Sequence, residues 1–188
     1  RRGFLPARPR RLLAPLPTAA GLRLAVAWGS PLEPFALEAV DLFKAQGLEL
    51  EPVHLEKDRA LPEGVAGLYL AGLLDEESLA AFAANEALKA ALSAAVAAGL
   101  PTLALGGGAL LLLRRLADSR GRTPELAGVL PGEAEVLEWY ERPRYLSVRA
   151  TAGNPFDEGD AVMCELFDLE FLVLERESPA YDVLGAGE

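Results

Sequence analysis

The sequence has one cysteine, one histidine, one methionine and no isoleucine in 188 residues. The single thiol, Cys164, excludes an intramolecular disulfide framework and a multi-cysteine metal site. His54 and Cys164 cannot form a zinc site without several carboxylates. No apolar run is long enough to cross a bilayer. We therefore predict no metal, no cofactor and no membrane partner, in a reducing, cytoplasmic setting.

The charge is unevenly distributed. Residues 1–23 carry six arginines and no acid, whereas the rest carries 12 basic and 28 acidic residues. An acidic body argues against nucleic-acid binding. Four prolines among the first 17 residues exclude a regular helix or a central strand there. We predict a linker or extended arm over 1–20 and one folded domain over 21–188.

The pattern of apolar residues and breakers predicts alternating strands and helices. Such alternation is typical of a parallel sheet with helices on both faces. After Leu130 the pattern changes to strands separated by turns, with a turn signal at Gly153-Asn154-Pro155. We expect strands at 22–27, 48–53, 67–70, 101–105, 136–140, 145–150, 161–167 and 171–174, and helices at 34–46, 76–84, 86–98 and 109–116.

The segment from Pro101 to Leu116 has the order apolar strand, glycine triplet, helix. Many α/β enzymes hold a catalytic nucleophile on such a turn, where backbone N–H groups stabilise an oxyanion. The nucleophile would stand at Gly106, and glycine has no side chain. We favour a tight turn that needs glycine; the alternative is a vestigial anion site built from backbone N–H groups.

Three segments carry a resemblance to a known family: Gly67-Leu-Tyr-Leu-Ala-Gly72, Leu100-Pro-Thr-Leu-Ala-Leu-Gly-Gly-Gly108 and Leu126-Ala-Gly-Val-Leu-Pro-Gly132. Together they resemble the glutaminase domain of cobyrinic acid a,c-diamide synthase, a class I glutamine amidotransferase, over roughly Leu22 to Val183. The resemblance implies a flavodoxin-like, three-layer α/β/α fold with a β-rich C-terminal part.

The resemblance also implies roles for particular positions. The family has a cysteine at the position of Gly106, and a glycine-rich oxyanion loop near Ala71-Gly72, to which Gly107 adds an N–H group. A late Glu-Phe-His segment matches Glu165-Leu166-Phe167. Glu165 corresponds to the retained acid, and Phe167 stands where histidine is expected. Both reactive groups are replaced, which argues against glutamine hydrolysis.

Three other candidates have simpler interpretations. Trp28-Gly29-Ser30 follows the first strand and either walls a ligand pocket or closes the core edge. The stretch 71–77 reads as a loop after the third strand, and Asp75 or a neighbouring acid in it is expected to cap the next helix. The acids Asp157, Glu158 and Asp160 lack the spacing of a calcium loop and indicate a solvated turn.

A cysteine–histidine dyad would need His54 and Cys164 to meet. Nothing in the sequence brings them together, and Cys164 is expected to be a small core residue. A relocated active site on Cys164 stays the weakest hypothesis.

Two hypotheses for the function remain. The first is a degenerate glutamine amidotransferase-like domain of cobalamin biosynthesis, a pseudoenzyme working beside an ATP-binding synthetase domain or subunit. The resemblance favours a fragment of a longer product, and no P-loop occurs in these residues. The second is a non-catalytic scaffold for a partner protein or a small anion. The alanine-rich helices could support a homodimer.

Overall fold

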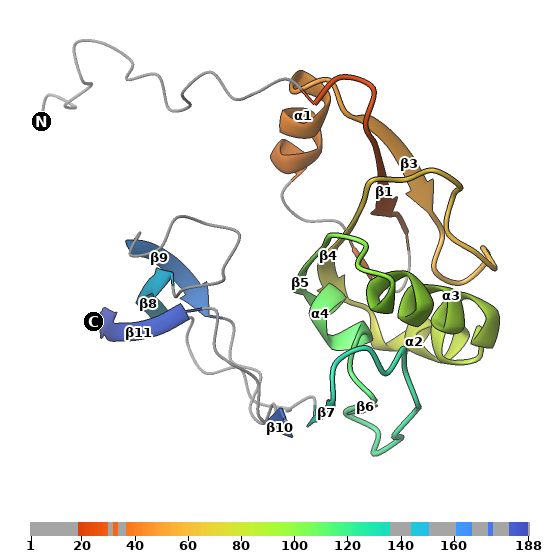
Figure 1. Ribbon diagram of the computed structural model, residues 1–188. Coiled ribbons are helices and arrows are strands. Elements are labelled where there is room, and N and C mark those ends of the chain that lie inside the picture. Colours follow the sequence, from red (N-terminus) through yellow and green to blue (C-terminus); the bar gives the residue numbers. More distant parts are fainter. Residues whose placement is uncertain are drawn as a thin grey trace, which may run out of the picture.

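The structure, a computed structural model, describes residues 19–29, 32–33, 37–135, 144–150, 161–166, 173–174 and 181–187. Figure 1 shows its elements in chain order: β1 (Arg23–Ala27), β2 (Leu32–Glu33), α1 (Leu37–Ala45), β3 (Glu49–Val53), β4 (Gly67–Leu74), α2 (Glu76–Ala83), α3 (Glu86–Ala97), β5 (Thr102–Gly106), α4 (Gly107–Leu111), β6 (Arg115–Ala117), β7 (Gly132–Glu135), β8 (Arg144–Ala150), β9 (Ala161–Leu166), β10 (Val173–Leu174) and β11 (Tyr181–Gly187).

The central sheet is parallel and has the strand order β3-β1-β4-β5, with β2 antiparallel to the end of β4. Helices α2 and α3 lie on one side of this sheet and α1 on the other (Figure 1). Parallel strands need crossover connections that place helices on the sheet faces. The predicted α/β architecture with three layers is therefore confirmed.

The two faces of the sheet bury separate apolar clusters. Leu68 and Leu70 of β4 join Phe82 of α2 and Leu88 and Leu92 of α3 in the larger cluster. On the opposite face of the sheet, Val26 of β1 and Tyr69 and Ala71 of β4 form the smaller cluster beneath α1. The Phe43 and Tyr69 rings meet edge to face at 5.1 Å. Burial raises the pKa of Tyr69, as expected for a phenol beneath a helix.

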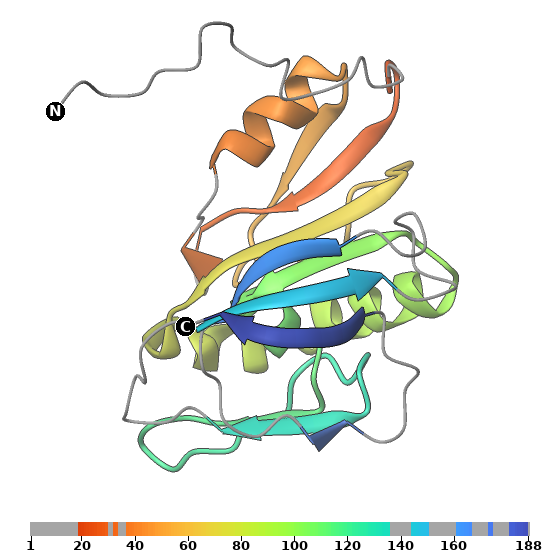
Figure 2. The same ribbon diagram turned by 90° about the vertical axis from the view of Figure 1, so that its left-hand side faces the viewer.

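Two smaller sheets follow the parallel core. One has the order β10-β7-β6 and the other β11-β8-β9, and the second is antiparallel throughout. Figures 1 and 2 place the β11-β8-β9 sheet on the same side of the central sheet as α1. The change from α/β to β-rich structure expected after Leu130 is therefore present.

Most expected elements match, but two are wrong and three were missed: β2, β7 and β11. The helix expected over 109–116 ends at Leu111, because Arg115–Ala117 pairs with β7 as β6 instead. The strand expected over 67–70 continues to Leu74, because β2 supplies backbone partners for Leu73 and Leu74. Strand β11 was not expected from the sequence.

Some expectations lie outside the described residues. These are most of the arm over 1–20, the strand over 136–140, the turn at 153–155 and the acids at 157, 158 and 160. The division of the chain at residue 20 stays a prediction.

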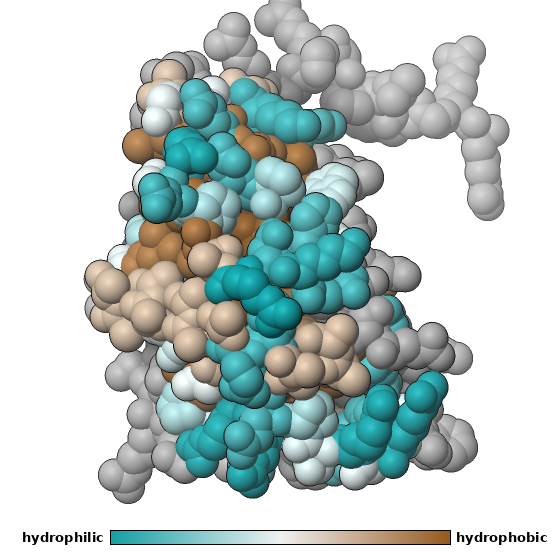
Figure 3. Space-filling model, turned by 90° about the vertical axis from the view of Figure 1, so that its right-hand side faces the viewer, coloured by the Kyte–Doolittle hydropathy of each residue, from teal (hydrophilic) through white to brown (hydrophobic). Residues whose placement is uncertain are grey.

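The face of the molecule that carries α2 and α3 mixes hydrophilic and apolar residues (Figure 3). Within the part of the chain that the structure describes, no helix is long and apolar enough to cross a membrane.

Candidate functional site

Gly106 lies where β5 ends and α4 begins. Its backbone has φ 57° and ψ −127°, a conformation that favours glycine. A sharp strand-to-helix turn of this kind presents the nucleophile in many α/β enzymes. Gly106 is exposed, whereas Gly107 and Gly108 are buried. The turn therefore has the expected form and presents no side chain.

The turn is held against β4 by a close backbone approach. A Cβ atom added to Gly108 would lie 2.6 Å from the carbonyl carbon of Leu70, and still closer to its oxygen. Two residue pairs further along β4 than Leu70, Gly72 lies in register with Gly106 of β5. Neither strand places a side chain at this pair, and Gly106 itself is exposed.

The sequence predicts a loop over residues 71–77, and this prediction is wrong for residues 71–74, which belong to β4. Ala71 and Gly72 are buried and belong to β4, as do Leu73 and Leu74. Leu74 packs on the larger core cluster, and pairing with β2 keeps the backbone extended. Ala71 and Gly72 therefore flank the Gly106 turn as strand residues. The oxyanion role inferred for Ala71, Gly72 and Gly107 stays a prediction. The capping role of Asp75 also stays a prediction.

His54 lies away from the Gly106 turn. A Cβ at Gly29 would be 3.7 Å from Nδ1 of His54, which places the imidazole beside the end of β1. Strands β1 and β4 separate β3 from β5, and three strand spacings amount to about 14 Å. His54 therefore does not serve the Gly106 position from within the sheet. Trp28, 41% exposed, lies at the same end of β1.

The late segment is described only in part. Cys164 and Glu165 belong to β9, opposite Leu146 and Tyr145 of β8. Phe167 lies just outside the described residues, as does Ser30. The roles inferred for Glu165 and Phe167 therefore stay predictions, and a His54–Cys164 pairing stays the weakest hypothesis.

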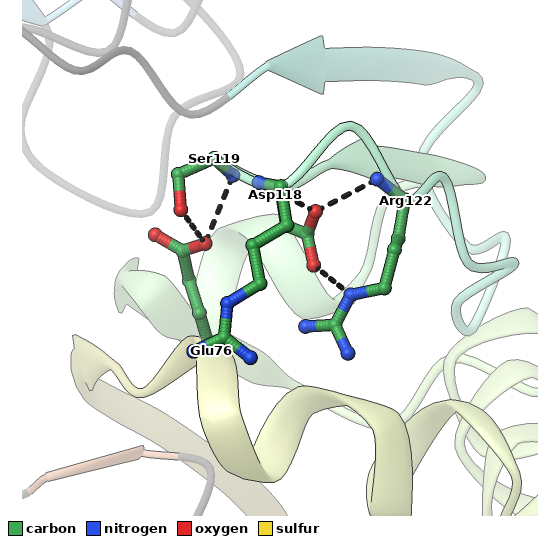
Figure 4. A network of polar contacts seen from close by, with 5 residues as sticks. Glu76, Asp118, Ser119 and Arg122 are labelled. Carbon is green, nitrogen blue, oxygen red and sulfur yellow. Dashed lines mark hydrogen bonds and ion pairs between the residues drawn. The ribbon is translucent and has the colours of Figure 1, made fainter.

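One polar cluster was missed in the sequence. The Asp118 carboxylate accepts hydrogen bonds from the backbone N–H groups of Arg120 and Arg122 and from Nε of Arg122, the last at 2.5 Å. Glu76 at the start of α2 accepts two more from Ser119 (Figure 4). An aspartate three residues before a glycine is a turn signal that could have found the turn at Asp118, but not its contact with Glu76. The cluster ties the 118–122 turn to α2.

Asp118 is expected to make the folding stability depend on pH. Burial of its side chain raises the pKa, but the hydrogen bonds from Arg122 and Arg120 outweigh burial and hold the pKa of Asp118 below its usual range. Such a carboxylate stabilises the fold above its unfolded pKa, about 3.9, and this contribution is lost as the pH falls through the folded value. We expect Asp118→Asn to flatten the loss of stability below about pH 4.

Urea denaturation between pH 3 and 7 measures this effect. Asp41→Asn, on the exposed surface of α1, is the matched control and should leave the wild-type pH profile unchanged. Profiles of equal steepness for Asp118→Asn and wild type would contradict the role of Asp118.

The described residues contain no group of three or more histidine, cysteine, aspartate or glutamate side chains placed to hold a metal ion. A shallow pocket borders the Asp118 cluster, lined by Leu79 and Ala80 of α2 and by Asp118, Arg122, Thr123 and Pro124. The two charged groups in its wall already bond each other.

Comparison with known proteins agrees with the fold and with the resemblance. No family model matches the chain. It is 30% identical to a cobyrinate a,c-diamide synthase of Priestia megaterium over 171 residues, 90% of this chain and 37% of that protein. It is 39% identical to a hydrogenobyrinate a,c-diamide synthase of Pseudomonas aeruginosa over 116 residues, 62% of this chain and 26% of that protein.

A solved structure of PurLQS from Thermotoga maritima shares the fold. It superposes with a TM-score of 0.63 at 15% identity, covering 87% of this chain and 75% of that one. The chain spans less than half the length of the curated relatives it matches. The fold is thus α/β of the class I glutamine amidotransferase type, and the chain is related in sequence to part of the cobyrinate and hydrogenobyrinate a,c-diamide synthases.

Proposed function

We propose that the chain is a glutamine amidotransferase-like domain of cobalamin biosynthesis that has lost glutaminase chemistry. The observation that carries this proposal is Gly106: the backbone turn of a nucleophile is present, without a reactive atom. Glutamine hydrolysis at such a site needs a thiolate to attack the amide carbon and a base to move the proton. Gly106 supplies neither, and the only imidazole lies beside β1.

In this proposal the domain supports an ATP-binding synthetase domain or subunit, which activates carboxylates of the corrin substrate. Because the turn releases no ammonia from glutamine, the synthetase would take free ammonia as its nitrogen donor. The sequence relationship to a,c-diamide synthases over part of their length supports this assignment.

A glutaminase assay on the purified chain tests the loss of chemistry. We expect ammonia release from glutamine at the level of a heat-denatured sample, both for wild type and for Cys164→Ala. Release by wild type that disappears in Cys164→Ala would overturn the proposal and make Cys164 a relocated nucleophile. Release that persists in the variant would also contradict it, once a second purification reproduces the rate.

The second candidate, a scaffold for an unrelated protein or a small anion, rests on the exposed backbone of Gly106 in the same turn. Assay of the chain together with the synthetase separates the two. Amidation supported by ammonium but not by glutamine, and dependent on this chain, fits the first proposal. Amidation unchanged when the chain is omitted favours the second.

A further inference from the structure

Strand β5 forms one edge of the central parallel sheet. Among the described residues it pairs with β4 alone, and β3 forms the opposite edge (Figure 1). An edge strand exposes unpaired backbone groups, which proteins commonly protect with charged residues or proline. β3 has this protection in Glu49, Glu51 and Pro52, whereas β5 has the sequence Thr-Leu-Ala-Leu-Gly, without charge or proline. β5 therefore has the composition of a strand that is paired on both sides.

The ladder to β4 determines which backbone groups of β5 remain at the edge. The N–H of Leu68 donates to the carbonyl of Pro101 at 2.9 Å, and Leu68 lies in register with Thr102. In a parallel ladder both backbone groups of a residue point to the same neighbouring strand, and successive residues alternate. Pro101 and every second residue after it therefore bond to β4. The groups left at the edge belong to Thr102, Ala104 and Gly106.

The face of β5 on the α1 side of the sheet is apolar and exposed. Leu103 and Leu105 are 43% and 40% exposed, although they lie in register with Tyr69 and Ala71 of the buried cluster beneath α1. Strands of parallel sheets are usually covered on both faces. Two exposed leucines beside a free backbone edge indicate a partner that is itself an extended apolar strand.

We propose that two copies of the chain pair through β5 in an antiparallel, twofold arrangement centred on Ala104. Antiparallel ladders alternate between hydrogen-bonded and non-hydrogen-bonded residue pairs. With the axis at Ala104, this residue faces its own copy and Thr102 faces Gly106, so every edge residue enters a hydrogen-bonded pair. The same axis places Leu103 opposite Leu105 of the second copy, in the pairs whose side chains come closest. A single register therefore satisfies both the backbone edge and the leucines, as a self-complementary interface requires.

The pairing joins the two parallel cores into one continuous sheet. It places Thr102 of the second copy opposite Gly106, so each Gly106 turn lies at one end of the shared edge. The homodimer interface is then β5 and not the alanine-rich helices. This inference does not depend on whether the turn performs chemistry, and its tests are separate from the glutaminase assay.

Ala104→Pro tests the backbone pairing. Proline removes the outward N–H of residue 104, but it removes no donor from the ladder to β4. We expect wild type to have the mass of two chains by light scattering. The variant should have a dimer Kd at least about tenfold higher, because two central hydrogen bonds are lost. Wild type with the mass of one chain at about 100 µM would overturn the dimer, as would a variant that dimerises like wild type.

Cysteine crosslinking tests the register and does not require the proline variant to fold. In a Cys164→Ala background, Ala104→Cys places thiols on residues whose Cα atoms lie about 5.5 Å apart, within the range of a disulfide. Thr102→Cys is the matched control, because its two copies lie about 14 Å apart along the paired strands. We expect the interchain disulfide of Ala104→Cys to form at least about tenfold faster on non-reducing gels. Equal rates, or a faster reaction of Thr102→Cys, would overturn the proposed register.

Leu105→Lys tests the contribution of the leucine pairs. A lysine opposite Leu103 of the second copy would have to leave water beside an apolar side chain, so we expect this variant to be a monomer where wild type is a dimer. Leu22→Lys is the control, because Leu22 is 49% exposed and directly precedes β1. It should dimerise like wild type. Equal dimerisation of Leu105→Lys and Leu22→Lys would overturn the assigned interface.

Discussion

Replacing Gly108 by alanine is expected to destabilise the domain by more than about 3 kcal/mol. The added Cβ would lie 2.6 Å from the carbonyl carbon of Leu70 and closer still to its oxygen. Both atoms belong to the backbone of β4, in the middle of the sheet, so no side chain can rotate away. Either α4 must move off the sheet or β4 must shift against β1 and β5. Urea denaturation followed by far-ultraviolet circular dichroism measures the loss.

Gly99→Ala separates the clash from the general cost of replacing glycine. Gly99 ends the turn after α3 with φ +90°, and a Cβ there would meet no atom within 4 Å. Alanine at this position should cost only about 1–2 kcal/mol, from the left-handed backbone. If Gly108→Ala lost no more stability than Gly99→Ala, the close packing of α4 on β4 would be wrong.

Replacing Asn85 by alanine is expected to cost about 3 kcal/mol. Asn85 is 2% exposed and lies between α2 and α3. Its Nδ2 donates to the carbonyls of Leu55 and Asp58 at 3.0 and 2.8 Å. Its Oδ1 accepts from the N–H of Leu88 and from Arg59. Alanine removes the helix cap and leaves the Leu55 carbonyl without this buried donor.

Asn85→Ser separates the contribution of the helix cap from that of the hydrogen bonds to the 55–58 loop. The serine hydroxyl is a good helix cap, but it is too short to replace the amide donors to the 55–58 loop. We expect Asn85→Ser to recover about 1 kcal/mol of the alanine loss and no more. Thermal unfolding of the three proteins at neutral pH gives the comparison. Full recovery by serine would show that the loop contacts contribute nothing.

The parallel core could be predicted because its signals are local. Gly47 and Gly99 end helices at positive φ, apolar runs mark β1 and β5, and the alternation of leucine and glutamate marks β3. The Gly106 turn follows from the same kind of signal, since a glycine triplet between strand and helix leaves few conformations.

Elements that depend on distant partners were mispredicted. The run Ala109–Leu116 reads as a helix, yet the N–H of Arg114 donates to the carbonyl of Gly132, 18 residues along the chain, and β6 follows. Strand β11 contains two glycines and an aspartate and is specified by its pairing with β8. Propensity is a weak guide where long-range ladders decide the conformation.

The site itself was only partly accessible to sequence reasoning. The sequence identifies Gly106 as a turn without a reactive side chain, and only the strand order shows that His54 lies far from it. The sequence does not show that Ala71 and Gly72 are strand residues, because only their pairing with β5 reveals this. The Asp118 cluster joins residues 43 positions apart, Glu76 and Ser119, and such a contact has no local signature.

The backbone conformation of Gly106 affects which residues evolution can accept at this position. A residue with a Cβ at φ 57° carries about 1–2 kcal/mol of backbone strain, which glycine does not. The geometry is set by the ladder to β4 and by Gly108, not by any reactive group. Exchange of a nucleophile for glycine at this turn therefore raises stability while it abolishes attack. Selection for a robust scaffold and selection for hydrolysis act on this position in opposite directions.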